Sequence, residues 1–161
     1  MAEPASVELQ KAIFAALIAD KSITAAIGMI AIGGKNVPAI FDKVPQEIID
    51  QITTGTYPTY ATIGDGTETF ELFDSTDEED DAELTTHTLA IAVYSQAIGL
   101  IEAKNIAHLI RKSLSSAFRA GTLALATNEI KSFDSARVEY SRLEGFVNYA
   151  ALQMRVLTSP K

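Results

Sequence analysis

The hydrophobic period changes within one stretch, from Thr85 to Ala117, and this change limits the folds open to the chain. From Thr88 to Val93, large apolar side chains alternate with small ones, which is typical of a strand. Further along, apolar residues recur every three or four positions, as in an amphipathic helix; they are Ala103, Ile106, Ala107, Ile110, Leu114 and Ala117. Because the connection from Ser95 to Gly99 is short, the helix must fold back beside the strand. This pair predicts a sheet with helices packed on it.

Weaker patterns before this stretch predict shorter elements. The chain is expected to have a helix from Ser6 to Ala19 with Ser6 as its N-cap, and a helical piece from Ile23 to Ile32 that ends at Gly33-Gly34. A short strand is expected at Ile40-Phe41 and a helical turn at Gln46 to Ile52. Tyr57 to Ile63 predicts another strand, closed by a turn at Gly64-Asp65-Gly66.

Two long alternating segments, Ile130 to Tyr140 and Phe146 to Thr158, should pair as an antiparallel hairpin. In the first segment, Ile130, Ala136, Val138 and Tyr140 are expected on one face and Lys131, Phe133, Arg137 and Glu139 on the other. With 161 residues the chain is expected to form a single domain, residues 1–161. The predicted class is α+β: a single mixed, mostly antiparallel sheet of four to five strands, two main helices packed on it, and a C-terminal β-hairpin.

Negative charge is concentrated in one run. Seven of the acidic residues are Asp74, Asp77, Glu78, Glu79, Asp80, Asp81 and Glu83, and the remainder of the chain is nearly neutral although the net charge is −8. Because like charges repel one another, we expect a mobile acidic loop at about 74–84. Three interpretations stay open: a solvated loop, a weak and unspecific cation site, or a rim or lining of a passage for DNA, where negative charge would keep the polyanion from sticking.

No pattern predicts catalysis, a cofactor or a metal ion, so the chain is not expected to be an enzyme. His87 and His108 do not have metal-ligand spacing, and structural roles are expected for both. Gly33-Gly34-Lys35 lacks the frame of a phosphate-binding loop. The chain has no cysteine, which excludes disulfides and thiolate chemistry. It also has no basic stripe for gripping nucleic acid.

Neither a membrane nor an export signal is expected. The most apolar window, Ile23 to Ile32, has about half the length that spans a bilayer. Met1 to Pro4 lack the basic region of a signal peptide. We therefore expect no membrane partner.

A set of short motifs then follows in a fixed order along most of the chain. They are Ile40-Phe41-Asp42, Val44-Pro45-Gln46, Tyr57-Pro58, His87-Thr88-Leu89, Val93-Tyr94-Ser95, Glu102-Ala103-Lys104, Ile106-Ala107, Ile110-Arg111, Ser135-Ala136-Arg137 and Arg155-Val156-Leu157-Thr158. In this order and spacing, the chain resembles the phage tail completion and tail terminator proteins, which also occur in gene transfer agents. It departs from the family pattern in the turn at Ser141 to Gly145 and in extra residues at Met29 to Pro38 and Gln46 to Thr56.

The resemblance implies a structural virion protein, made in the host cytoplasm, that forms a homo-oligomeric ring, a hexamer, on the head-proximal end of the tail tube. Such a ring would end tube polymerisation and form the head-tail joining surface. Its partners would be further copies of itself, the tail tube protein and a head-tail connector or stopper protein, and DNA would pass through its lumen without specific binding.

Exposed edge strands are a ready source of contacts between subunits. We therefore expect the C-terminal hairpin to supply part of the ring contact, through Arg137, Glu139, Tyr149, Gln153 and Arg155. The acidic run would lie at the lumen or rim. The alternative is a small soluble α+β adaptor or binding module unrelated to a virion.

Overall fold

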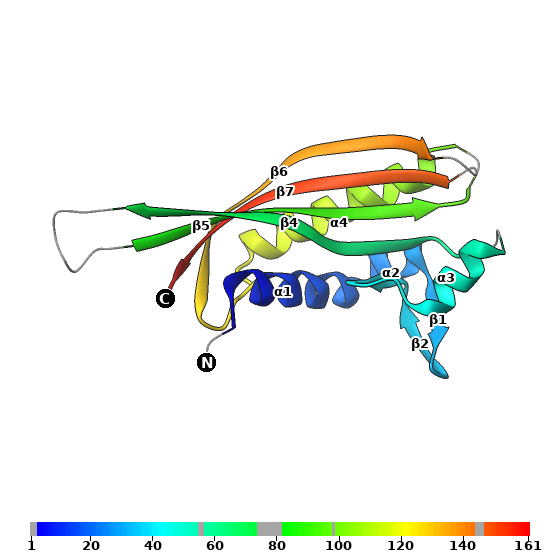
Figure 1. Ribbon diagram of the computed structural model, residues 1–161, viewed down its shortest axis with the longest axis horizontal. Coiled ribbons are helices and arrows are strands. Elements are labelled where there is room, and N and C mark those ends of the chain that lie inside the picture. Colours follow the sequence, from blue (N-terminus) through cyan, green and yellow to red (C-terminus); the bar gives the residue numbers. More distant parts are fainter. Residues whose placement is uncertain (1–2, 55–56, 74–81, 98, 144–146) are drawn as a thin grey trace.

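A computed structural model of the chain has helices on one face of a curved sheet and a long two-stranded arm at one end (Figure 1). It describes residues 3–54, 57–73, 82–97, 99–143 and 147–161. The elements are α1 (Ala5–Ala19), α2 (Lys21–Ile27), β1 (Met29–Ile32), β2 (Lys35–Pro38), β3 (Ile40–Phe41), α3 (Gln46–Thr53), β4 (Tyr60–Phe73), β5 (Ala82–Ser95), α4 (Ile101–Arg119), β6 (Asn128–Leu143) and β7 (Val147–Pro160).

The main sheet has five strands in the order β3-β4-β5-β7-β6. Its neighbouring strands are antiparallel except β3 and β4, which run parallel. β1 and β2 form a separate two-stranded sheet. The structure confirms the predicted α+β class, the mixed sheet and the C-terminal hairpin, which is formed by β6 and β7. The small β1–β2 sheet is not part of the prediction.

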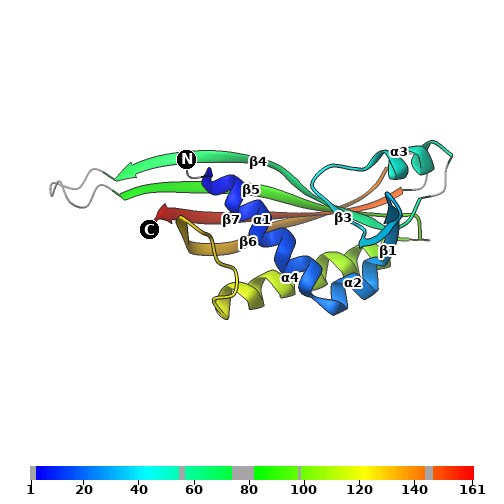
Figure 2. The same ribbon diagram turned by 90° about the horizontal axis from the view of Figure 1, so that it is seen from below.

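The core lies between the sheet and its helices. The predicted stripe of α4 is buried from Ala103 to Leu114, with Ile106, Ile110 and Leu114 no more than 2% exposed, and Ala117 is partly buried. It packs beneath β5 and β7, which turn Ile91 and Leu152 toward it. Figure 2 shows α1 and α4 on the same side of the sheet. The central strand and helix predicted from the change of period are therefore confirmed.

The predicted helical piece from Ile23 to Ile32 is wrong in its second half. α2 ends at Ile27 because Gly28 adopts φ 89° and ψ −177°, a backbone region that essentially only glycine enters. The chain then continues as β1, which pairs with β2. The start of α1 differs too: Pro4 is the N-cap, and Ser6 lies inside the helix.

The turn predicted at Gly64-Asp65-Gly66 is also wrong. β4 runs through these residues to Phe73, and a register shift against β5 lies between Gly64 and Gly66. Such a bulge absorbs one extra residue without ending the strand. As a result, β4 and β5 extend together as the arm of Figure 1.

Phe133 lies on the face opposite to the predicted one. β6 shifts register against β7 between Ile130 and Ser132 and again between Ser135 and Arg137. Each bulge adds one residue, and one residue reverses the facing of all side chains beyond it. Phe133 is therefore buried toward α4, with its ring centroid 5.9 Å from that of Phe118.

Candidate assembly interface

The two edges of the main sheet lie on opposite margins of the molecule (Figure 2). β6 forms one edge and pairs with β7 alone within the described chain. At the other edge β3 covers only Ala61 and Thr62 of β4. Beyond them, in the described residues, the outer side of β4 has no strand partner. Both edges thus present backbone groups to which another chain can pair.

The structure brings the five predicted contact residues of the hairpin onto one face of the sheet. Arg137 pairs in register with Gln153, and Glu139 and Tyr149 lie on the same face, as does Arg155. This is the face that α1 and α4 leave uncovered, and on it Arg137 forms an ion pair with Glu139. Because β7 lies inside the sheet, only β6 of the hairpin has a free edge. Contact of these residues with another subunit stays a prediction.

Most of the predicted acidic loop lies outside the described residues. Asp74, Asp77, Glu78, Glu79, Asp80 and Asp81 belong to that part of the chain. Glu83 belongs to β5, where its backbone pairs with Leu72 of β4. It therefore lies at the far end of the arm, and the role of the acidic run at a lumen or rim stays a prediction.

A row of tyrosines crosses the uncovered face, and sequence reasoning missed it. Tyr60, Tyr94 and Tyr149 lie on the adjacent strands β4, β5 and β7, with ring centroids 4.8 Å and 5.2 Å apart. Tyr57 meets Tyr60 edge to face at 5.7 Å. Burial, and to a lesser extent the neighbouring phenols, raises the pKa of Tyr60 to about 12. Only the strand register reveals this row, since the residues are far apart in sequence.

Polar contacts hold the start of α4 against the strand ends. The carboxylate of Glu102 accepts hydrogen bonds from the hydroxyls of Thr59 and Ser95, the second at 3.1 Å. Asn148 donates to the carbonyl oxygen of Ala97 at 2.5 Å. These bonds join the residue before β4, the end of β5 and the segment after it, β7 and α4 at the end of the sheet opposite to the arm. Thr59, Ser95 and Asn148 are the sequence neighbours of the three tyrosines in the row.

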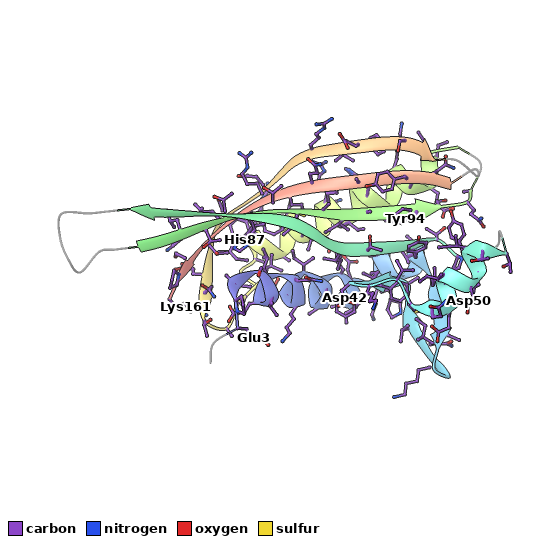
Figure 3. All side chains as sticks on the ribbon, in the orientation of Figure 1. Glu3, Asp42, Asp50, His87, Tyr94 and Lys161 are labelled. Atoms are coloured by element: carbon purple, nitrogen blue, oxygen red, sulfur yellow. The ribbon has the colours of Figure 1, made fainter. Side chains whose placement is uncertain are left out.

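The two histidines lie apart. His87 is buried beneath the sheet (Figure 3), with its Nε2 atom 2.9 Å from the hydroxyl oxygen of Thr158. His108 is exposed on α4. Within the described ranges, no three His, Cys, Asp or Glu residues are grouped so that they could hold a metal ion. In the same part of the chain, no helix combines the length and hydropathy needed to cross a membrane.

Comparisons with known proteins agree with the motifs of the sequence. A model of the family described as tail completion protein gp17 matches residues 11–153. A comparison with curated protein sequences finds no match. Among solved structures, a chain of the virion of a native gene transfer agent (GTA) particle has the same fold, with a TM-score of 0.65 and 22% identity over 98% of this chain and 99% of that chain.

The family match covers most of the chain, including the central strand and helix, and it confirms the resemblance inferred from the sequence motifs. The likeness to the gene transfer agent chain supports the same fold over nearly the whole length of both chains. The protein therefore belongs to the tail completion protein gp17 family, and it is a structural protein of a virion tail.

Proposed function

We propose that copies of this chain form a ring, a hexamer, on the head-proximal end of the tail tube. The ring stops tube polymerisation by covering the last tube subunits, and its opposite surface receives the connector or stopper protein of the head. The protein works by shape and makes or breaks no bond. Family membership supports a place in the tail, and the subunit's own geometry supports the ring.

The observation that carries the proposal is the pair of free edges on opposite margins of one sheet. A ring needs a heterologous contact, in which two different surfaces of identical subunits meet. The outer edge of β4 and the outer edge of β6 are two such surfaces. Edge strands left open on a stable protein promote association, so both are expected to be covered in the assembled state.

The hairpin face and the acidic run complete the proposal. The mixed charges of Arg137, Glu139 and Arg155, together with Gln153 and Tyr149, suit a polar contact surface next to the β6 edge. The acidic run between β4 and β5 in the sequence suits the rim or lumen, where it would let DNA pass without holding it.

The direct test is a tube polymerisation assay. Tail tube protein of the same particle is assembled with and without this chain, and tube lengths and ends are measured by electron microscopy. The proposal expects short tubes with a ring at one end only. Tubes of unchanged length with bare ends would contradict it and would favour the soluble adaptor.

The role of the hairpin is tested separately by gel filtration with light scattering. A variant with the β6–β7 hairpin shortened around Ser141 should lose the ring. A matched control shortens the other hairpin, β1–β2, at its Gly33-Gly34 turn and should keep the ring. Intact rings from the first variant would remove the hairpin from the contact.

A further inference from the structure

The first helix is apolar on nearly all sides. Its polar residues are Ser6, Glu8, Gln10 and Lys11, and the chain from Ala12 to Ala19 contains none. Leu9, Ile13 and Leu17 are buried in the core, yet Val7, Phe14 and Ile18 are exposed by 39%, 37% and 39%. A helix that is hydrophobic all round is normally buried all round. The monomer leaves one side of α1 uncovered.

Two polar residues of α1 are hydrogen-bonded to other parts of the subunit. The carboxylate of Glu8 accepts hydrogen bonds from Thr127 at 2.6 and 3.0 Å, and Gln10 donates to the carbonyl oxygen of Ile63 at 3.3 Å. The polar groups of Glu8 and Gln10 are thus satisfied within the subunit, whereas Val7, Phe14 and Ile18 present large apolar side chains to the outside. This arrangement is expected where the outward side meets another protein surface.

The exposed side of α1 lies toward the β4 edge, away from α4. Val7, Gln10, Lys11 and Phe14 line a hollow of about 290 Å³ together with Asp42, which follows β3. The opposite side of α1 faces α4, where Ala12 and Ala16 lie near Ser113 and Ala117. We call Val7, Phe14 and Ile18 with this hollow the α1 flank.

The α1 flank is acidic at its border. Asp42 is exposed and has no ion pair within the described residues, and the adjoining α3 exposes Glu47 and Asp50. Of the nearby lysines, Lys11 is paired with Glu3 at 2.5 Å, and Lys43, which follows Asp42, is exposed, so the border has three carboxylates against one lysine that is not in an ion pair within the described residues. Figure 3 shows Glu3, Asp42 and Asp50 spread along the side of the molecule on which α1 lies.

Helix α4, which lies next to β6, carries the opposite charge. From Ala103 to Asn128 the chain has four cationic residues, Lys104, Arg111, Lys112 and Arg119, and no Asp or Glu. Lys104 stands over the ring of Tyr140, with its Nζ 4.9 Å from the ring centroid, and Tyr140 is 43% exposed on the edge strand β6. We call Tyr140, Lys104 and Arg111 the β6 flank.

We propose that the β6 flank of a second copy of this chain docks on the α1 flank. The contact would cover the exposed apolar side of α1 with Tyr140 and the α4 surface of the neighbour, and it would bring Lys104 and Arg111 near Asp42 and α3. It joins the two margins that carry the free edges of β4 and β6, so the same operation repeats around a ring. The inference rests on the proposed ring and names the surfaces that form it.

The absence of native cysteine makes the contact directly testable by cross-linking. A chain carrying both Phe14→Cys and Tyr140→Cys is assembled under conditions in which the wild-type chain forms rings, and a short bis-maleimide is added. A head-to-tail contact produces a ladder of covalent oligomers that ends at the ring size. A second pair, Phe14→Cys with His108→Cys, tests the neighbouring part of the surface. The control pair Asn36→Cys with Tyr140→Cys keeps one thiol and moves the other to an exposed position of β2, near the β1–β2 turn, and it should produce no ladder.

The outcomes separate this inference from the function on which it rests. A ladder with either Phe14 pair, and none with the control, supports the inference. Wild-type rings with no ladder from either Phe14 pair overturn the inference and leave the ring in place. Cross-linked dimers from Phe14→Cys alone also overturn it, because the same surface would then meet itself. A wild-type chain that assembles neither in solution nor on tubes overturns the proposed ring and the inference together.

Discussion

The carboxylate of Glu8 accepts two hydrogen bonds from Thr127, one from its backbone N–H at 3.0 Å and one from its hydroxyl at 2.6 Å, across 119 positions of sequence. Asn128 donates to the same carboxylate at 3.2 Å. These bonds fasten α1 to the beginning of β6, the edge strand. They also lower the pKa of Glu8, since hydrogen bonds from donors favour the charged form over the opposing effect of burial.

Glu8 should therefore make the stability of the protein depend on pH. Its pKa is lower in the folded state than the ordinary value of 4.5, so its contribution is fully present above that value and is lost as the pH falls through the folded pKa. Glu8→Gln should lower the Tm at neutral pH, because an amide N–H₂ would face the donors of Thr127 or Asn128. The difference in Tm between variant and wild type should shrink on acidification. Glu3→Gln, on the exposed end of the chain, is the control, and an equal pH dependence in both variants would contradict the assignment.

Tyr60 predicts a second pH effect, at the alkaline side. Its pKa is raised from 10.0 to about 12, so the folded state favours the neutral phenol, and the stability that Tyr60 contributes is lost as the pH rises from about 10 through about 12. In a spectroscopic titration, Tyr60→Phe should remove a tyrosinate step near pH 12. Tyr140→Phe, which changes an exposed ring, should leave that step in place. If Tyr140→Phe removed the step near pH 12 and Tyr60→Phe did not, the assignment of that step to Tyr60 would be wrong.

The packing of α4 under the sheet predicts that substitutions on its buried and exposed sides differ in their effect on stability. Ile110 of α4 is 0% exposed and Ile101 of the same helix is 71% exposed. Ile110→Ala should lower the free energy of unfolding by about 2–5 kcal/mol, since it removes buried methyl groups and leaves a cavity. Ile101→Ala should change it by no more than about 0.5 kcal/mol. Urea denaturation measures both, and similar losses would mean that α4 does not pack as described.

Regular periodicity explains the parts of the fold that could be predicted. The apolar stripe of α4 and the alternating residues of β5 each extend over several periods, so the residues that the pattern predicts to be buried are buried or partly buried. The alternation in β6 and β7 likewise predicts their pairing as a hairpin. The bulges in β4 and β6 could not be predicted, because a local pattern does not reveal where a strand gains a residue against its partner. For this reason the sequence pattern predicts the wrong face for Phe133, and it predicts that the strand from Tyr57 ends at Ile63 although β4 continues to Phe73.

The candidate contact surfaces likewise include residues that local periodicity predicts and residues that only the tertiary structure brings together. Arg137, Glu139 and Gln153 were predicted as a group because alternation within one hairpin defines their face. The tyrosine row depends on the pairing of three strands, and the exposure of Phe14 depends on where α1 lies relative to β3 and α4. Both are tertiary relationships. The lack of polar residues from Ala12 to Ala19 is nevertheless a sequence signal that more than one side of this helix should be buried, in agreement with the proposed contact.

The acidic run supplies a prediction that separates its interpretations. Replacing Asp77, Glu78, Glu79, Asp80 and Asp81 by their amides should change the free energy of unfolding by no more than about 0.5 kcal/mol, because no core contact is expected to be lost. If the run lines or rims a DNA passage, assembled rings of this variant should bind duplex DNA more tightly than wild-type rings, with the difference largest at low salt. Asp134→Asn with Glu3→Gln removes exposed negative charge elsewhere and should leave DNA binding unchanged. A large loss of stability would make the run structural, and DNA binding equal to wild type would favour a solvated loop.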